Sequence, residues 1–331
     1  MRLRFRRLSV GPWRRSPIEA KPLRFALTRI IGNDLPPRHA PGQTLTNLRF
    51  ILANEPELSG CSKRWILNRI VDPDVEAAMT ATLDAYQQAH SRIDFRLDVF
   101  GRIEREKRLP ESRTSTPEDR ASTTEEVCNR ALLRAERPRI TYAIPVNAAR
   151  NLALREAQED ADWILPFDGN CFLSQGAWAR IREFVERQPE VRYVAVPMAR
   201  ASTYETAFSK IEPINAEEEP QIMFHRDAAL AFDESYPYGR RDKVQLLWRL
   251  GVKGSWDRWH DDPWDLPRPK AIVSGQQVGA AGWVTRLPSG HAKFEHGRAA
   301  GRERTNAREE AILRFLGLLD ERLRREALHS R

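Results

Sequence analysis

Long apolar runs and paired cysteines are absent from this 331-residue sequence. No hydrophobic stretch approaches the ~18 residues of a membrane-spanning helix, and the basic start has no apolar core of the kind found in secretion signals. The three cysteines, Cys61, Cys128 and Cys171, lie far apart and show no metal-ligand spacing. We therefore expect reduced cysteines in a cytoplasmic protein.

An excess of positive charge is also absent from most of the chain, although the net charge is +8. Residues 1–24 carry eight Lys or Arg against one acid, Glu19, so the remainder is close to neutral. A near-neutral body argues against nucleic acid as a partner. We expect residues 1–22 to form a flexible basic arm. It is either a solvated tail or a contact with an anionic surface such as the inner membrane face.

Apolar segments of strand length alternate with amphipathic segments of helix length. Strands are expected at 23–31, 63–72, 92–100, 161–168 and 191–199, helices at 44–56, 74–90 and 176–188, and a strand, turn and helix over 141–160, with Asn147 as helix cap. This order predicts an α/β fold in which helices flank a mostly parallel central sheet. The polar stretch 101–126 is a long loop or an insertion.

Two of the predicted strands end on an aspartate. Asp72 closes "KRWILNRIVD", and Asp168 closes "ADWILPFD" before a glycine and an asparagine. Ligands of parallel sheets bind at the carboxyl edge of the strands. Asp-Gly is also a common turn, so Asp168 alone indicates either a ligand site or a tight turn.

Four ordered segments carry a family resemblance: "RIIGNDLPPRH", "ILNRIVDPD", "NAARNLAL" with "DWILPFDGN", and "FDESYPYGRRDKVQLLWRLGV". Together they resemble nucleotide-sugar-dependent glycosyltransferases of the GT-A fold, family-2 type. The resemblance covers about residues 24–255 and implies a single large domain with a GT-A-like (Rossmann-like) sheet over 23–255. It places the donor at Arg29, Asn33, Asp34, Asp72, Arg150, Asn151 and Asp168. Arg150 near a helix start would suit a diphosphate.

The resemblance also implies a divalent metal ion. The family's D-x-D element matches Asp168, Gly169 and Asn170, so Asp168 and Asn170 would bind Mg²⁺ or Mn²⁺. The amide at position 170 removes one negative charge. Mg²⁺ nevertheless binds through as few as one or two carboxylates together with phosphate oxygens.

Asp242 is the candidate catalytic base. It is the second member of an acid pair whose first position is Arg241 here, and in the family that second acid takes the proton of the acceptor hydroxyl. The alternative is a simple helix cap. The resemblance implies an inverting, single-displacement transfer.

Residues 256–331 are expected to form a Trp-rich loop and a C-terminal helix packed on the same domain. Trp256 and Trp259 lie among acids, which suits sugar binding, and equally a loop folded over the core. Asn306 and Glu309 suggest a capping box for the helix, whose apolar stripe is Ile312, Leu316, Leu319 and Leu323.

The sequence thus predicts a glycosyltransferase that moves a sugar from a nucleoside-diphosphate sugar to a hydroxyl, with a growing surface glycan as the expected acceptor. Two alternatives stay open. A nucleotidyltransferase would need more carboxylates than "FDGN" supplies. A non-catalytic nucleotide- or glycan-binding relative would bind a donor without turning it over.

Overall fold

The computed structural model describes residues 22–105, 124–209, 218–254, 256, 266–270, 278–291, 293 and 299–329. The predicted basic arm up to residue 21, most of the predicted loop 101–126 and Trp259 lie outside these residues.

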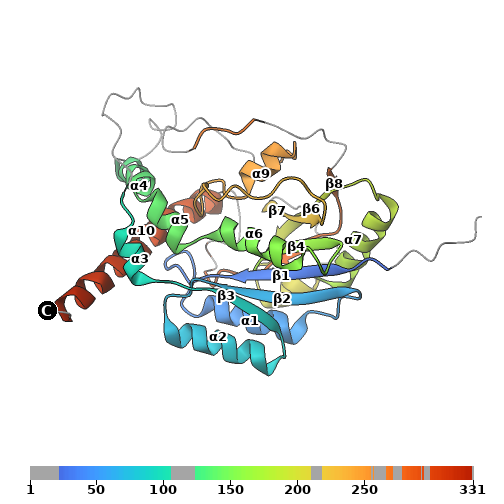
Figure 1. Ribbon diagram of the computed structural model, residues 1–331, viewed down its shortest axis with the longest axis horizontal. Helices are drawn as coiled ribbons and strands as arrows, with labels where there is room; N and C mark the ends of the chain where they lie inside the picture. Colours follow the sequence, from blue (N-terminus) through green and yellow to red (C-terminus); the bar gives the residue numbers. More distant parts are fainter. Residues whose placement is uncertain are drawn as a thin grey trace, which may run out of the picture.

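A central sheet organises the chain (Figure 1). Its parallel half has the order β3 (Ala89–Ile93), β2 (Cys61–Asn68), β1 (Phe25–Ile31) and β4 (Trp163–Asp168). The sheet continues through β7 (Glu218–His225), which runs antiparallel to both β4 and β6 (Tyr193–Arg200). Next to β6 lie β8 (Val278–Ala280) and β9 (Val284–Arg286), and β9 pairs with β5 (Cys171–Phe172). The expected mixed α/β architecture with a mostly parallel sheet is confirmed.

Helices cover both faces because side chains of a strand alternate between them. On β2, Trp65 and Leu67 pack with α1 (Gln43–Asn54) and α2 (Pro73–Ala85). On the other face, Ile66 packs with Ala149 and Ala153 of α6 (Val146–Ala157). The remaining members of these layers are α7 (Gln175–Arg187), α8 (Tyr204–Ser209) and α9 (Val244–Arg249). Because β4 is buried on both faces, its sequence is an almost unbroken apolar run.

A helical group closes one end of the sheet (Figure 1). It consists of α3 (Leu97–Arg102), α4 (Thr124–Ala135), α5 (Arg137–Ala143) and the long α10 (Ala299–His329). The predicted stripe of α10 is buried here at Ile312, Leu316 and Leu319, which are at most 3% exposed. The helix begins at Ala299, so Asn306 and Glu309 lie inside it and the predicted capping box is wrong.

Three predicted elements differ from the structure. The strand expected over 92–100 ends at Ile93, and residues 97–102 are helical because Leu97 and Phe100, one turn apart, pack into the helical group. The strand expected near 141 is helix α5, whose Ile140 and Ala143 join the same core. Strand β2 ends at Asn68, and Asp72 instead caps α2 by accepting hydrogen bonds from the amides of Asp74 and Val75.

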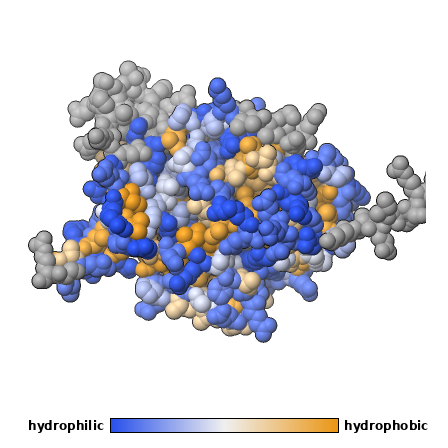
Figure 2. All heavy atoms as spheres, in the orientation of Figure 1, coloured by the Kyte–Doolittle hydropathy of each residue, from blue (hydrophilic) through white to orange (hydrophobic). Residues whose placement is uncertain are grey.

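Polar side chains dominate the face of the molecule shown in Figure 2, with small apolar patches between them. Among the described helices, none combines the length and the apolar character that crossing a membrane requires. The three cysteines are unpaired, as expected.

Candidate active site

The turn Asp168–Gly169–Asn170 lies where the carboxyl ends of β1 and β4 meet. Asp168 is in register with Ile30, and the Asn170 carbonyl accepts a hydrogen bond from the Leu287 amide, 2.9 Å away. A Cβ on Gly169 would lie only 2.6 Å from the Ile30 carbonyl oxygen. Glycine is required at this position because the turn sits directly on the end of β1.

One guanidinium joins the two acids that the sequence analysis singled out. Arg150 Nη2 lies 2.8 Å from Asp168 Oδ1, and its Nη1 lies 2.9 Å from Asp242 Oδ2. The Arg150 side chain is 5% exposed, against 26% for Asp168 and 13% for Asp242. Two carboxylates from distant segments are therefore held on one buried cation at the sheet edge.

The face of α6 that carries Arg150 also fixes the segment before Asp242. Asn147 Nδ2 donates to the backbone carbonyls of Asp233 and Asp242, at 2.7 and 2.8 Å. Asn151 Nδ2 donates to the Phe232 carbonyl, and its Oδ1 accepts from the Phe232 amide. Asn147 is thus not the helix cap that the sequence predicted. Asn151 is buried against the 232–234 turn rather than exposed in the cavity described below.

Asp242 does not cap α9. Its Oδ1 accepts from the Gly239 amide at 3.2 Å, and the cap position of α9 is occupied by Lys243 without a side-chain hydrogen bond. Arg241, directly before it, has φ near 64°, an uncommon backbone conformation for a residue with a side chain. The cap alternative of the sequence analysis is therefore wrong, and the base role stays a prediction.

Lys243 was missed by the sequence analysis and lies at the centre of the site. Its side chain is 1% exposed, and its Nζ lies 3.3 Å from Asp168 Oδ2 and 3.4 Å from Glu219 Oε1. Although burial raises it, Lys243 and Arg150 hold the pKa of Asp168 well below its usual value. The only sequence signal was a lysine directly after the candidate base and before an apolar helix.

The arrangement around Asp168 does not fit a divalent metal ion. Oδ1 of Asp168 faces Arg150. Its Oδ2 faces Lys243 and also accepts a hydrogen bond from Nε2 of Gln221, 3.0 Å away. No group of three acidic, histidine or cysteine side chains is disposed for a metal anywhere in the described ranges. A divalent ion at Asp168 and Asn170 would have to displace two cationic side chains.

A cavity of about 840 Å³ opens over Arg150, Asp168, Asn170 and Asp242, whereas the buried Lys243 is outside its lining. The strand ends contribute Asn33 and Asn68 to its lining. Asn68 is 3% exposed, and its Oδ1 has no hydrogen-bond partner. A buried acceptor without a partner at a cavity wall indicates a ligand that donates to it. The sequence analysis missed Asn68 because the strand was expected to run on to Asp72.

The other residues predicted to bind the sugar donor, which lie on or after the first two strands, have structural roles. Arg29 is fully buried and ion-paired with Glu55. Asp34 accepts hydrogen bonds from the amide and hydroxyl of Thr44 at the start of α1. Along with Asp72, these residues are outside the cavity lining. Asn33 lines the cavity while bonding to the backbone of Arg69 and Val71.

A group of arginines forms another part of the cavity lining. We call the five residues Arg38, Arg200, Arg286, Arg304 and Arg308 the arginine wall. The described cavity lining as a whole holds seven arginines and four acidic residues. Because the sequence carries these arginines on separate segments, no local pattern revealed them.

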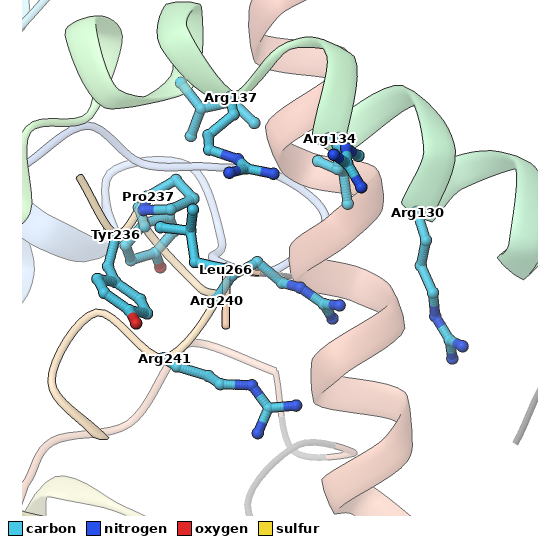
Figure 3. Close-up of a pocket in the computed structure, with 11 residues that line it drawn as sticks. Arg130, Arg134, Arg137, Tyr236, Pro237, Arg240, Arg241 and Leu266 are labelled. Carbon is cyan, nitrogen blue, oxygen red and sulfur yellow. The ribbon is translucent and has the colours of Figure 1, made fainter. Parts of the chain in front are cut away.

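A second group of arginines adjoins the cavity (Figure 3). It comprises Arg130, Arg134 and Arg137 from α4 and α5 with Arg240 and Arg241, around Tyr236, Pro237 and Leu266. Arg241 and Tyr238 line both spaces, so the basic surface continues from the large cavity toward α4.

Trp256 is the predicted acceptor residue that the structure describes. It lines the cavity, and its Nε1 is buried without a hydrogen-bond partner. Its ring also packs near the Phe232 core, as expected for a loop folded over the core, and acceptor binding by Trp256 stays a prediction.

No protein-family model and no curated protein matches this chain. Three glycosyltransferases are among the solved structures with a similar arrangement. The mannosyltransferase PcManGT of Pyrobaculum calidifontis, in complex with GDP-Man and Mn²⁺, is 12% identical, with a TM-score of 0.41 over 89% of this chain. The chain spans 64% of the length of that protein, less than two thirds.

Glucosyl-3-phosphoglycerate synthase from Mycobacterium tuberculosis, in complex with Mg²⁺ and UDP, is 11% identical, with a TM-score of 0.32 over 80% of this chain and 71% of its own. Mouse xyloside xylosyltransferase 1, in its apo form, is also 11% identical, with a TM-score of 0.28 over 71% and 73% of the two chains.

Proposed function

We propose that this protein transfers a sugar from a nucleoside-diphosphate sugar to a hydroxyl group of an acceptor. The observation that carries the proposal is the shared guanidinium of Arg150, which holds Asp168 and Asp242 together at the floor of the large cavity. A carboxylate able to take a proton thus lies beside cations able to receive an anionic leaving group. Glycosyl transfer to a hydroxyl needs both.

We place the donor along the ends of β1, β2 and β4. The volume of about 840 Å³ suits a ligand of nucleotide-sugar size. Asn68 Oδ1, which lacks a partner, would accept a hydrogen bond from the base. The diphosphate would lie near Arg150, which lines the cavity, and Lys243, buried behind Asp168, would add positive charge beside it.

The chemistry follows from these positions. Asp242 takes the proton of the acceptor hydroxyl as its oxygen bonds to the anomeric carbon. The bond from that carbon to the diphosphate breaks, and the leaving group departs with the electron pair. Arg150 and Lys243 stabilise the negative charge that develops on it. A diphosphate also competes with Asp242 for Arg150, which would free the base only when a donor is bound.

Several finer features stay predictions from the sequence. They are the inverting outcome, a surface glycan as acceptor, and a cytoplasmic setting with the basic arm at the inner membrane face. We derive no step through a metal ion because the side chains around Asp168 do not fit one.

A panel of nucleotide sugars tests the proposal. Release of nucleoside diphosphate is measured for the wild type, Asp242→Asn and a matched surface variant, Asp227→Asn, whose side chain is 69% exposed. We expect one donor to be turned over by the wild type and by Asp227→Asn. Asp242→Asn should lose about 10²- to 10⁴-fold in turnover while binding the product diphosphate at least as tightly as the wild type, because the competing carboxylate is removed.

The same panel separates the alternatives. A donor that binds tightly and is never turned over, with candidate acceptors present, would support the non-catalytic relative. Release of pyrophosphate from a nucleoside triphosphate and a sugar phosphate would support the nucleotidyltransferase. Binding of no nucleotide at all would contradict the proposed function.

A further inference from the structure

We propose that the arginine wall is a second anion-binding subsite, separate from the donor diphosphate, and that it holds a phosphate group carried by the acceptor. Its role in acceptor recognition rests on the proposed function. Its ability to bind phosphate does not.

Three members of the wall converge on one carboxylate. Arg200, Arg286 and Arg304 lie 3.0, 3.2 and 3.6 Å from the carboxylate oxygens of Glu218. Their side chains are 7, 17 and 21% exposed, respectively. One glutamate thus serves as the shared counter-ion of three largely buried guanidinium groups. Clustered guanidinium groups match the geometry of phosphate oxygens and bind them through charge-assisted hydrogen bonds.

Burial, together with the arginines of the wall, lowers the pKa of two groups that line the cavity. Burial, followed by Arg286 and Arg308, lowers the pKa of Arg38 to about 9. Burial and the same three arginines lower the pKa of His39 to about 3. Two different side chains therefore experience surroundings that disfavour additional positive charge. An anion in the cavity would relieve this repulsion.

The wall is assembled from elements that the fold holds rigidly. Arg200 ends β6 and Arg286 ends β9, and these strands are paired in register at these two residues. Arg304 and Arg308 are one turn apart on α10 and share a face. A Cβ on Gly239 would lie 2.6 Å from Arg308 Cδ, so that glycine makes room for the stem of Arg308. This preorganisation reduces the entropy lost when an anion is bound.

The position of the wall favours the acceptor over the donor. Arg150 and Lys243 already provide two cations at the strand ends, where we place the donor diphosphate. The wall comes from β6, β9, α10 and the loop after β1. Arg286 is paired with Cys171 beside the Asp168 turn, whereas Arg308 packs on Gly239, whose amide donates a hydrogen bond to Asp242. Because the acceptor hydroxyl must lie at Asp242, an anionic group bound at the Arg308 end of the wall belongs to the acceptor.

Isothermal titration calorimetry with inorganic pyrophosphate tests the subsite. Pyrophosphate is titrated into the full-length protein alone and after saturation with the nucleoside diphosphate selected by the donor panel. The proteins are the wild type, Arg308→Gln, Arg308→Lys and a control on the same helix, Arg314→Gln, whose side chain is 64% exposed. A thermal melt of each variant checks that it folds.

We expect pyrophosphate to bind whether or not the nucleoside diphosphate is present. Arg308→Gln should weaken pyrophosphate binding at least tenfold and nucleoside diphosphate binding less than twofold, while Arg314→Gln changes neither. Arg308→Lys should recover part of the affinity because the charge is kept. Transfer assays should then favour a phosphorylated acceptor over the same sugar without phosphate at least tenfold in kcat/KM, and Arg308→Gln should erase that preference.

Competition between pyrophosphate and the nucleoside diphosphate, with Arg308→Gln weakening both equally, would overturn the proposal and assign the wall to the donor. Absence of pyrophosphate binding to the wild type would also overturn it. If no nucleoside diphosphate binds but pyrophosphate binds in an Arg308-dependent way, the subsite is supported and the proposed function fails. The two failures are therefore distinguishable.

Discussion

Asp168 and Asp242 are held 2.8 and 2.9 Å from the two terminal nitrogens of one arginine, Arg150, so the candidate base and the strand-end acid form a single electrostatic unit. A carboxylate of this unit cannot be removed without changing the surroundings of the other. Energetic coupling between the members is therefore the direct consequence of the geometry.

We expect Arg150→Met to destabilise the protein by about 3 to 5 kcal/mol, because it leaves carboxylates buried with fewer partners. In a double-mutant cycle with Asp242→Asn, the coupling energy should be about 1 to 3 kcal/mol. Urea unfolding at pH 7 measures both. Additive losses in the double variant would show that the ion pair contributes no coupling, contrary to this geometry.

Lys243 lies against the carboxylate at which the sequence resemblance placed a metal ion. Because two cationic side chains already neutralise Asp168, we expect donor turnover to persist in EDTA within about twofold. Lys243→Met should reduce turnover about tenfold or more, since it removes a buried charge worth about 1.5 to 3 kcal/mol as a hydrogen-bond donor. Lys253→Met, at an exposed position, is the control.

The measurement is nucleoside diphosphate release with EDTA, Mg²⁺ or Mn²⁺ in parallel. Abolition of wild-type turnover by EDTA with recovery on Mn²⁺ would contradict this expectation and support the metal ion that the sequence suggested.

The sheet was predictable because its strands carry local signals. The run "WILPFD" is apolar throughout, as a strand buried on both faces requires, and it ends on Asp168 as expected. The segment before α6 was wrongly predicted as a strand, because the apolar "YAI" before Pro145 suits a strand as well as a short helix. Its helical state is decided by packing against α10, which lies far along the chain.

The candidate site was only partly predictable, for the same reason. Asp168, Asp242 and Arg150 belong to motifs of the resemblance. Arg29 and Asp72 were also assigned through the resemblance, yet Arg29 is buried with Glu55 and Asp72 caps α2. Lys243 and the arginine wall depend on how separate segments meet, which a linear pattern does not encode.

Gly169 offers a test of the close approach between the Asp168–Asn170 turn and the end of β1. Gly169→Ala would place a Cβ 2.6 Å from the backbone oxygen of Ile30, which cannot move aside as a flexible side chain would. We expect a loss of about 1 to 3 kcal/mol in unfolding free energy. Gly317→Ala is the matched control, because its Cβ would meet nothing within 4 Å on α10. It should stabilise the helix by about 0.5 to 1 kcal/mol. Equal effects of the two variants in urea unfolding would contradict the packing seen at the turn.

Acid stability should depend on His39. Its Nδ1 accepts a hydrogen bond from the Leu35 amide at 3.3 Å, which requires the ring to be unprotonated at that nitrogen. Burial, followed by Arg38, Arg286, Arg308 and His291, lowers its pKa to about 3, whereas the unfolded chain binds the proton near pH 6.5.

Between these pH values the unfolded state binds a proton that the folded state does not, so stability is complete above about pH 6.5 and falls as the pH is lowered toward 3. At pH 5 this costs up to about 2 kcal/mol relative to pH 8. His39→Gln should remove that part of the loss, and His329→Gln, an exposed residue of the last helix turn, should leave it in place. Unfolding free energies at pH 8 and pH 5 measure the difference.

Saturating pyrophosphate should also reduce the loss of stability at low pH in the wild type, because an anion beside Arg38 and Arg308 raises the pKa of His39. Identical pH dependence in wild type and His39→Gln would show that the positive cavity does not act on this ring.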